Sequence, residues 1–140
     1  MIKSTRKIVF LFVVTCVINT VAGGQPSTAK QIRAHEFYLR KKAITSVIPK
    51  YPLAARKDNA SGVTVSQITI DENGQVLNVE VLQSPHPAIE AEVKEALYKW
   101  RFSKFTINGK PFKTTGKLTF YFIIEKGRAR VEGPNPYVSQ

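Results

Sequence analysis

The chain has 140 residues, 43% of them apolar, which is enough for one folded domain with additional segments. It carries 21 Lys and Arg against 10 Asp and Glu, a formal net charge of +11 at pH 7. Its one cysteine excludes a disulfide within the chain, and its two isolated histidines are too few for a metal site without several carboxylates. We therefore expect no metal and no cofactor.

Residues 1–23 have the order of a secretory signal. Basic residues come first, an apolar run follows over residues 8–18, and small residues at 21–24 offer a cleavage point. The apolar run is short for a membrane span, which needs about 20 residues. We expect a cleaved signal peptide, with a retained membrane anchor as the alternative. Cys16 follows Thr15, where a smaller residue is usual in a lipoprotein signal, so lipidation is disfavoured.

The excess of positive charge persists after cleavage. Three of the 21 basic residues precede residue 24, so 18 would remain against 10 acidic ones, a balance of +8. Such a balance can attract acidic polymers or phosphate-rich surfaces. The basic residues are scattered, apart from residues 40–42, and no aromatic stripe alternates with them as single-strand binders require. We interpret the charge as a solvated surface and expect no nucleic acid as a partner.

Residues 24–48 are expected to form a linker with an N-terminal helical segment. Ser27 or Thr28 could cap a helix over residues 29–42. One side of this helix would carry Ile32, His35 or Glu36, and Leu39. Pro49 and Pro52 then enforce an extended approach, and Pro52 can open a short helix over residues 53–57.

A β-hairpin is predicted next. Residues 62–70 are rich in β-branched side chains, as in a strand, and their alternation slips once near Ser66 and Gln67. A bulge would explain the slip, as would partial burial of both faces. Residues 71–74 form the loop, where Gly74 can take a positive φ, and residues 75–83 form the returning strand.

Residues 87–102 contain the best amphipathic helix of the sequence. Pro87 suits a first helical position, and acidic residues precede basic ones along the segment, as the helix dipole favours. Its apolar stripe consists of Ile89, Val93, Ala96, Leu97 and Trp100. We place Trp100 in the core rather than at a ligand-stacking site.

The last predicted strand covers residues 116–124, after a turn at Asn108-Gly109. Phe120 and Phe122 lie on one face and are expected in the core. Tyr121 and Ile123 lie on the other face, where either burial or exposure on a binding face fits the pattern. Residues 126–140 lose periodicity and are predicted to be a flexible tail.

These elements predict an α+β fold: a small antiparallel three-stranded sheet with helices packed on one face. The order is helix, strand, strand, helix, strand, and one domain covers residues 49–125. The hairpin makes the first two strands neighbours, and the last strand can pair with either. No Ser-His-Asp order, carboxylate pair or glycine-rich phosphate loop occurs, so we do not expect an enzyme.

Four segments together resemble the C-terminal domain of the TonB family of periplasmic energy transducers. They are Pro49-Lys50-Tyr51-Pro52 with Ala54-Ala55; residues 62–74; residues 76–82; and Trp100-Arg101-Phe102 with Asn108-Gly109-Lys110-Pro111 and the strand to residue 124. They follow the family's order and spacing over more than half of the chain.

The resemblance implies a non-catalytic periplasmic module whose last strand accepts an extended peptide of an outer-membrane receptor by strand addition. Carried over, the pairing edge would consist of Lys117, Leu118, Thr119, Phe120, Tyr121, Phe122 and Ile123. Tyr51 and Pro52 would lie at the start of the domain, where the family's upstream chain can also touch receptors.

Three features differ from the family's transducers. Residues 24–50 contain only Pro26 and Pro49 in place of a long proline-rich spacer, and the apolar N-terminal run looks cleavable. Lys104-Phe105 also stand where the family usually has Pro-Ala. The resemblance thus implies the binding fold rather than force transmission, and inner-membrane motor proteins would be partners only of an anchored chain. An edge-paired dimer or an envelope complex unrelated to transport is the alternative role, and polyanion binding is a third.

Overall fold

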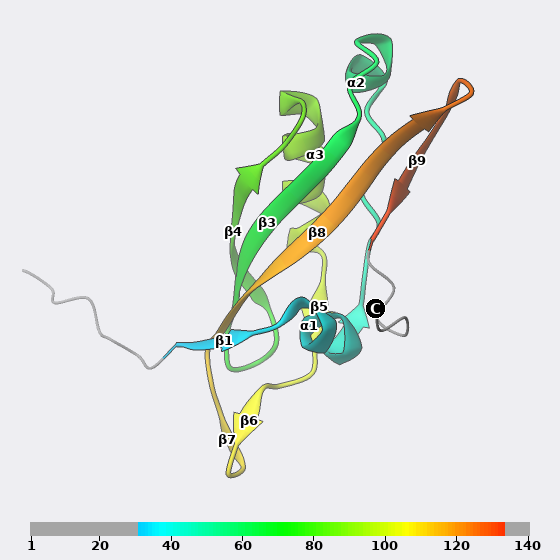
Figure 1. Cartoon of the computed structure of the whole chain (residues 1–140). Helices are drawn as coiled ribbons and strands as arrows, with labels where there is room; N and C mark the ends of the chain where they lie inside the picture. The colour runs from blue at the N-terminus through cyan, green and yellow to red at the C-terminus, as the bar shows by residue number, and fades with distance from the viewer. Residues whose placement is uncertain (1–30, 134–140) are drawn as a thin grey trace, which may run out of the picture.

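A computed structural model describes residues 31–133 of the chain (Figure 1). The predicted signal peptide and the last residues of the predicted tail lie outside the described residues. Within residues 31–133, no helix has both the length and the apolar character that crossing a membrane would require.

One twisted sheet forms the body of the fold, with strand order β1-β8-β3-β4 and β9 paired to β8. The neighbours β3 and β4 form the predicted hairpin, and β8 runs antiparallel to β3. The strands of this sheet are β1 (Ile32–Ala34), β3 (Gly62–Ile70), β4 (Val76–Gln83), β8 (Thr114–Glu125) and β9 (Arg128–Glu132). The predicted α+β class is confirmed, and the last predicted strand pairs with the first strand of the hairpin.

The sheet has five strands, whereas three were predicted. β1 is only three residues long and pairs parallel to the start of β8, within the segment for which we predicted a helix over residues 29–42. β9 lies in the predicted tail: Lys126 and Gly127 turn the chain at φ 49° and 74°, so that residues 128–132 return along β8. Both strands form because β3 pairs with only one side of β8, which leaves the backbone groups on its other side for β1 and β9.

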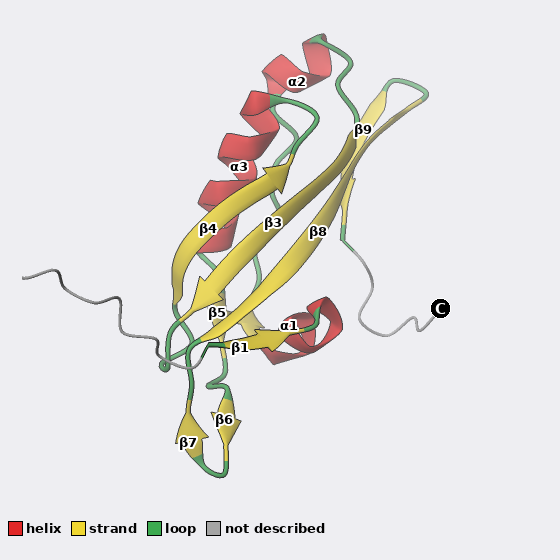
Figure 2. Cartoon of the chain, turned by 60° about the vertical axis from the view of Figure 1, so that its left-hand side comes forward, coloured by secondary structure: helices red, strands yellow, loops and turns green. Residues whose placement is uncertain are grey.

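Helices α2 (Leu53–Lys57) and α3 (Pro87–Tyr98) lie on one side of the sheet (Figure 2). The His86 imidazole begins α3 by accepting a hydrogen bond from the Ala88 amide at 3.0 Å. α3 ends at Tyr98, earlier than the predicted stretch, and Trp100 follows in a tight turn. Trp100 is nonetheless buried as predicted, and its Nε1–H donates to the Val47 carbonyl at 2.9 Å.

The core lies between this face of the sheet and the helices. Its members include Ile68 and Ile70 of β3, Leu118, Phe120 and Phe122 of β8, and Ile89, Val93 and Leu97 of α3. Thr64 and Ser66 of β3 also face the core and are fully buried. β3 pairs with β8 in a continuous register, so β3 has no bulge on that side. The hydrophobic pattern only appeared to slip, because Thr64 and Ser66 place polar side chains at core positions.

Shorter elements complete the domain. Helix α1 (Glu36–Lys42) follows β1 directly and lies beside β8, where Leu39 reaches the core. Two small sheets pair β2 (Ala43–Thr45) with β5 (Arg101–Phe102), and β6 (Thr106–Ile107) with β7 (Lys110–Pro111). The β6–β7 hairpin turns at Asn108-Gly109, as the sequence predicted, and projects from one end of the molecule (Figure 1).

Candidate functional site

The residues proposed from the sequence as a pairing edge all lie on β8. In a strand, the N–H and C=O groups of successive residues point to opposite sides. On β8 the groups of odd-numbered residues point away from β3: the Lys113 carbonyl accepts from the Ile32 amide, and the Thr119 amide and carbonyl bond to side chains of α1. We call this the outer side of β8, and another strand could add only there.

The two ends of the outer side are already paired within the chain. β1 runs parallel to Thr114–Gly116, and its Ile32 amide bonds to the Lys113 carbonyl at 3.2 Å. At the other end, β9 pairs antiparallel with the stretch from Tyr121 to Glu125. Among the described residues, no strand pairs with the outer side between Gly116 and Tyr121.

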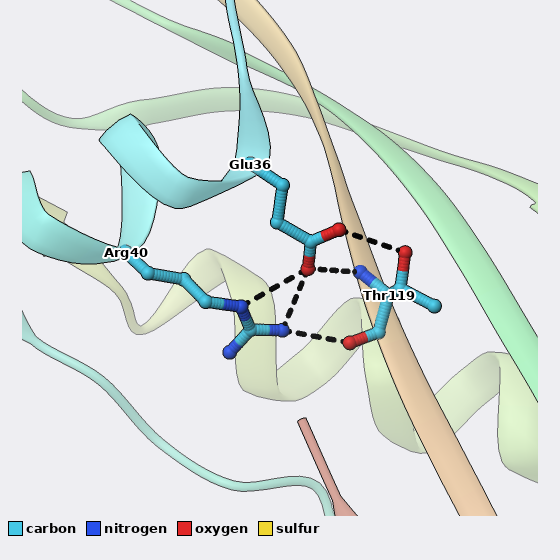
Figure 3. Close-up of polar contacts among 3 residues, drawn as sticks. All are labelled: Glu36, Arg40 and Thr119. Atoms are coloured by element: carbon cyan, nitrogen blue, oxygen red, sulfur yellow. Dashed lines mark hydrogen bonds and ion pairs between the residues drawn. The ribbon is translucent and has the colours of Figure 1, made fainter. Parts of the chain in front are cut away.

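Two side chains of α1 close this gap (Figure 3). A Glu36 carboxylate oxygen accepts from the Thr119 amide at 2.7 Å, and the other carboxylate oxygen accepts from the Thr119 hydroxyl at 2.9 Å. Arg40 Nη2 donates to the Thr119 carbonyl at 2.7 Å. Both backbone groups of Thr119 on the outer side are thus satisfied by side chains in place of a strand.

The two side chains also bind each other. Arg40 Nε and Nη2 both donate to one Glu36 oxygen, at 3.0 and 2.9 Å. The Arg40 guanidinium lies over the Phe120 ring, 5.3 Å from its centroid, and 5.9 Å from that of Trp100. Only 11% of the Arg40 side chain and 23% of the Glu36 side chain are exposed, so the pair is partly desolvated. A charge-assisted pair in such a place is strong but costly to break.

The seven predicted edge residues divide by face. Leu118, Phe120 and Phe122 are buried in the core, and their side chains cannot meet a partner. On the opposite face, Lys117 and Tyr121 are exposed, whereas Thr119 and Ile123 are half-buried. The alternative left open for Tyr121 is settled in favour of exposure, at 40%.

The second predicted segment lies near the far end of β8. Tyr51 packs edge-on against Phe122, with 5.3 Å between ring centroids, and its hydroxyl donates to the Ala60 carbonyl. Burial raises the pKa of the Tyr51 phenol. Pro52 precedes α2 and is half-buried. The structure therefore places Tyr51 and Pro52 on the core side of the sheet, and Tyr51 contacts β8 through Phe122.

The opposite edge of the sheet, along β4, is blunted. Its register against β3 shifts twice, between Val65 and Ser66 and between Thr69 and Ile70 of β3. The Val79 amide, which points away from β3, donates to the Tyr98 hydroxyl at 3.3 Å. Bulges and capped amides are features that protect an edge from further pairing.

A groove of about 480 Å³ runs beside the outer side of β8, lined by Arg33, Glu36, Gln67 and Lys117 among others. Arg33 and Lys117 give it a positive rim. Within residues 31–133, no group of three potential metal ligands lies together.

Sequence reasoning missed the role of Glu36 and Arg40. It considered Glu36 only as a position on a helix face and Arg40 only as part of a basic run. Their i,i+4 spacing, with the acid first, was a usable signal for an ion pair. Their contact with Thr119, 83 positions away from Glu36, had no local signature.

Residues 47–124 match the family model described as Gram-negative bacterial TonB protein C-terminal. The chain is 39% identical over 75 residues to Protein TonB of Yersinia enterocolitica, and the aligned stretch covers 53% of this chain and 29% of that protein. It is 33% identical over 81 residues to Protein TonB of Pseudomonas aeruginosa, covering 57% and 24%, and 32% identical over 105 residues to Protein TonB of Vibrio cholerae, covering 72% and 43%. The chain thus spans less than half of the length of these relatives.

A solved structure has the same fold. The solution NMR structure of the Pseudomonas aeruginosa TonB C-terminal domain superposes with a TM-score of 0.52 at 32% identity, covering 62% of this chain and 89% of that one. The segment that carries β1, α1 and β2 precedes the residues that match the family model.

Proposed function

The chain belongs to the family of Gram-negative TonB C-terminal domains, and on this premise we propose that it is an exported, non-catalytic module that binds an extended peptide along β8. The peptide would come from a TonB-dependent outer-membrane receptor or another envelope protein. The domain would act in the periplasm in TonB-dependent transport. Motor proteins of the inner membrane would join it only if the N-terminal segment stays in the membrane.

The proposal rests on one observation, that the outer side of β8 has a gap in its strand pairing. At Thr119 both backbone groups are held by side chains, and β1 and β9 stop short of it on either side. An added strand could replace these side-chain bonds with backbone bonds of the same polarity. Backbone pairing would supply affinity, and the exposed Lys117 and Tyr121 would select among side chains of the peptide.

An NMR titration tests the proposal. The isotope-labelled full chain would be titrated with short synthetic peptides taken from extended segments of outer-membrane receptors. We expect the largest amide shift at Thr119, whose amide points to the gap in the outer side, with smaller shifts at the flanking Lys117 and Tyr121. A control peptide with prolines at alternate positions lacks donors for the ladder and should bind far more weakly.

Shifts confined to other elements, or none at millimolar peptide, would contradict the proposal. Shifts along β4 would move the binding edge to the other side of the sheet. Shifts at Tyr51 without shifts on β8 would support only the segment at the start of the domain.

An assembly role is the alternative, because a second copy of the chain could use the same backbone groups. Sedimentation velocity over a range of concentrations separates the two. A strictly monomeric chain that binds receptor peptides leaves only the first role. A concentration-dependent dimer that peptides do not dissociate favours the second.

A further inference from the structure

We propose that α1 is an autoinhibitory latch: Glu36 and Arg40 imitate a partner strand at Thr119, and the peptide must displace them in order to bind. This inference rests on the proposed function, since it concerns access to the same side of β8. It adds two residues that lie outside the segment matched by the family model. It also predicts that the domain binds the peptide with a lower affinity than it would have without the latch.

Glu36 and Arg40 together offer Thr119 the same donor and acceptor that a partner strand would offer. A strand residue paired with Thr119 would offer one acceptor to its amide and one donor to its carbonyl. Glu36 offers the acceptor at 2.7 Å and Arg40 the donor at 2.7 Å. The bonds between Glu36 and Arg40 hold the acceptor and donor together as one unit. A peptide backbone and this unit therefore compete for the same two groups and cannot bind them at once.

The latch has a reason to be present when no partner is bound. Half-buried backbone groups without hydrogen-bond partners are costly, and an unpaired strand edge invites aggregation. Glu36 and Arg40 remove both problems at Thr119, within the gap between β1 and β9. Because side chains rather than a ladder close the gap, opening it breaks hydrogen bonds at one residue of β8 only.

The element that carries the latch is short and has one buried anchor. α1 has seven residues, and its N-cap residue, His35, makes no side-chain cap bond. A helix this short is unstable on its own. β1 and β2, which flank it, are three residues each. Leu39 is its one buried residue, while Phe37 and Tyr38 are 56% and 46% exposed. α1 can therefore leave β8 without unfolding the sheet between β3 and β4.

Glu36→Ala removes the latch, and Glu90→Ala is the matched control. Glu90 on α3 makes the same i,i+4 contact, with Lys94 at 2.6 Å, but touches no backbone amide of β8. Both variants would be made in the full chain. Two quantities are measured: hydrogen exchange at individual amides, and the dissociation constant of the synthetic receptor peptide by calorimetry.

In Glu36→Ala we expect the Thr119 amide to exchange at least about tenfold faster, because its acceptor is gone. The Phe120 amide, which points to β3, should keep its rate. The peptide should bind about tenfold more tightly, because less of the protein is held in the closed state. Glu90→Ala should change neither quantity.

If the Phe120 and Ile68 amides also exchange faster in Glu36→Ala, the substitution has loosened the fold. Glu36→Gln is then used as the test variant instead. The amide oxygen of Gln can still accept from Thr119, but its charge for Arg40 is lost, so about a threefold gain in affinity is expected. An unchanged affinity in the folded variant overturns the latch, as does an unchanged exchange rate at Thr119.

The outcomes separate the latch from the proposed function. Equal peptide binding by the wild type and Glu36→Ala, with shifts on β8, overturns the latch and leaves the proposed function standing. Binding to neither overturns the proposed function and the latch with it. If Glu36→Ala binds the peptide more tightly than the wild type and Glu90→Ala does not, the result supports the latch and the proposed function.

Discussion

Leu39 of α1 occupies the space in which a side chain at Gly116 of β8 would stand. A Cβ at position 116 would lie 2.5 Å from Leu39 Cδ1 and 2.6 Å from the Ala34 carbonyl oxygen. Gly116 is required here for close approach of two segments, rather than for an unusual backbone angle. The N-terminal segment is therefore fitted to β8 and does not merely lie against it.

Gly116→Ala should lower the free energy of unfolding by about 1–3 kcal/mol, because the added methyl overpacks a site with no space. Urea denaturation of the full chain measures this loss. Leu39→Ala in the same chain should couple with it, since removing the leucine relieves one of the two clashes and leaves the other at Ala34. Strictly additive effects of the two substitutions would contradict this packing.

Trp100→Phe should cost about 1–3 kcal/mol of unfolding free energy. It removes the hydrogen bond from Nε1 to the Val47 carbonyl. It also leaves a cavity in the core, because the Trp100 side chain is only 2% exposed. Tyr98→Phe is a fitting comparison, because Tyr98 is 44% exposed and its hydroxyl makes a longer bond, of 3.3 Å, to the Val79 amide. Calorimetric melting of both variants should give the smaller loss for Tyr98→Phe.

The periodic segments could be predicted from the sequence. The β3–β4 hairpin, the stripe of α3 and the apolar face of β8 each repeat their pattern often enough to identify both the element and its buried face. The α+β class and the burial of Trp100 followed from them. These elements lie within the part of the chain that matches the family model.

What the sequence could not predict depends on distant contacts. β1 and β9 have three and five residues, too few for a period to be read, and they are strands only because β8 offers an unpaired side. The role of Glu36 required knowing that α1 would lie beside Thr119. A local pattern can indicate an ion pair, but it cannot tell which backbone groups that pair will reach.

Arg40→Ala and Arg130→Ala should differ sharply in stability, although both arginines pair with glutamate. Arg40 is 11% exposed and also bonds to Thr119, so its loss strands a partly buried carboxylate and should cost about 2–4 kcal/mol. Arg130 pairs with Glu125 and Glu132 at 46% exposure, where water screens the ion pairs, so its loss should change the stability little. Urea denaturation at two salt concentrations compares the two variants, and similar losses would contradict the difference.

Tyr51 should make the domain less stable in alkali. Burial raises the pKa of its phenol above the ordinary value of 10.0. The folded state therefore favours the neutral form, so its contribution is complete below about pH 10 and is lost as the pH rises through the folded pKa. Urea denaturation in small pH steps above neutrality measures the loss.

Tyr51→Phe isolates this effect from the other groups that titrate in alkali. It removes the ionising group, so the fall in stability above pH 10 should become shallower than in the wild type. At neutral pH it should cost about 1 kcal/mol, because the Ala60 carbonyl loses its donor. Tyr121→Phe serves as the control, since it removes the hydroxyl of a tyrosine that is 40% exposed and lies on the other face of β8. An equal alkaline slope in all three proteins would mean that the Tyr51 phenol ionises as readily in the folded as in the unfolded chain.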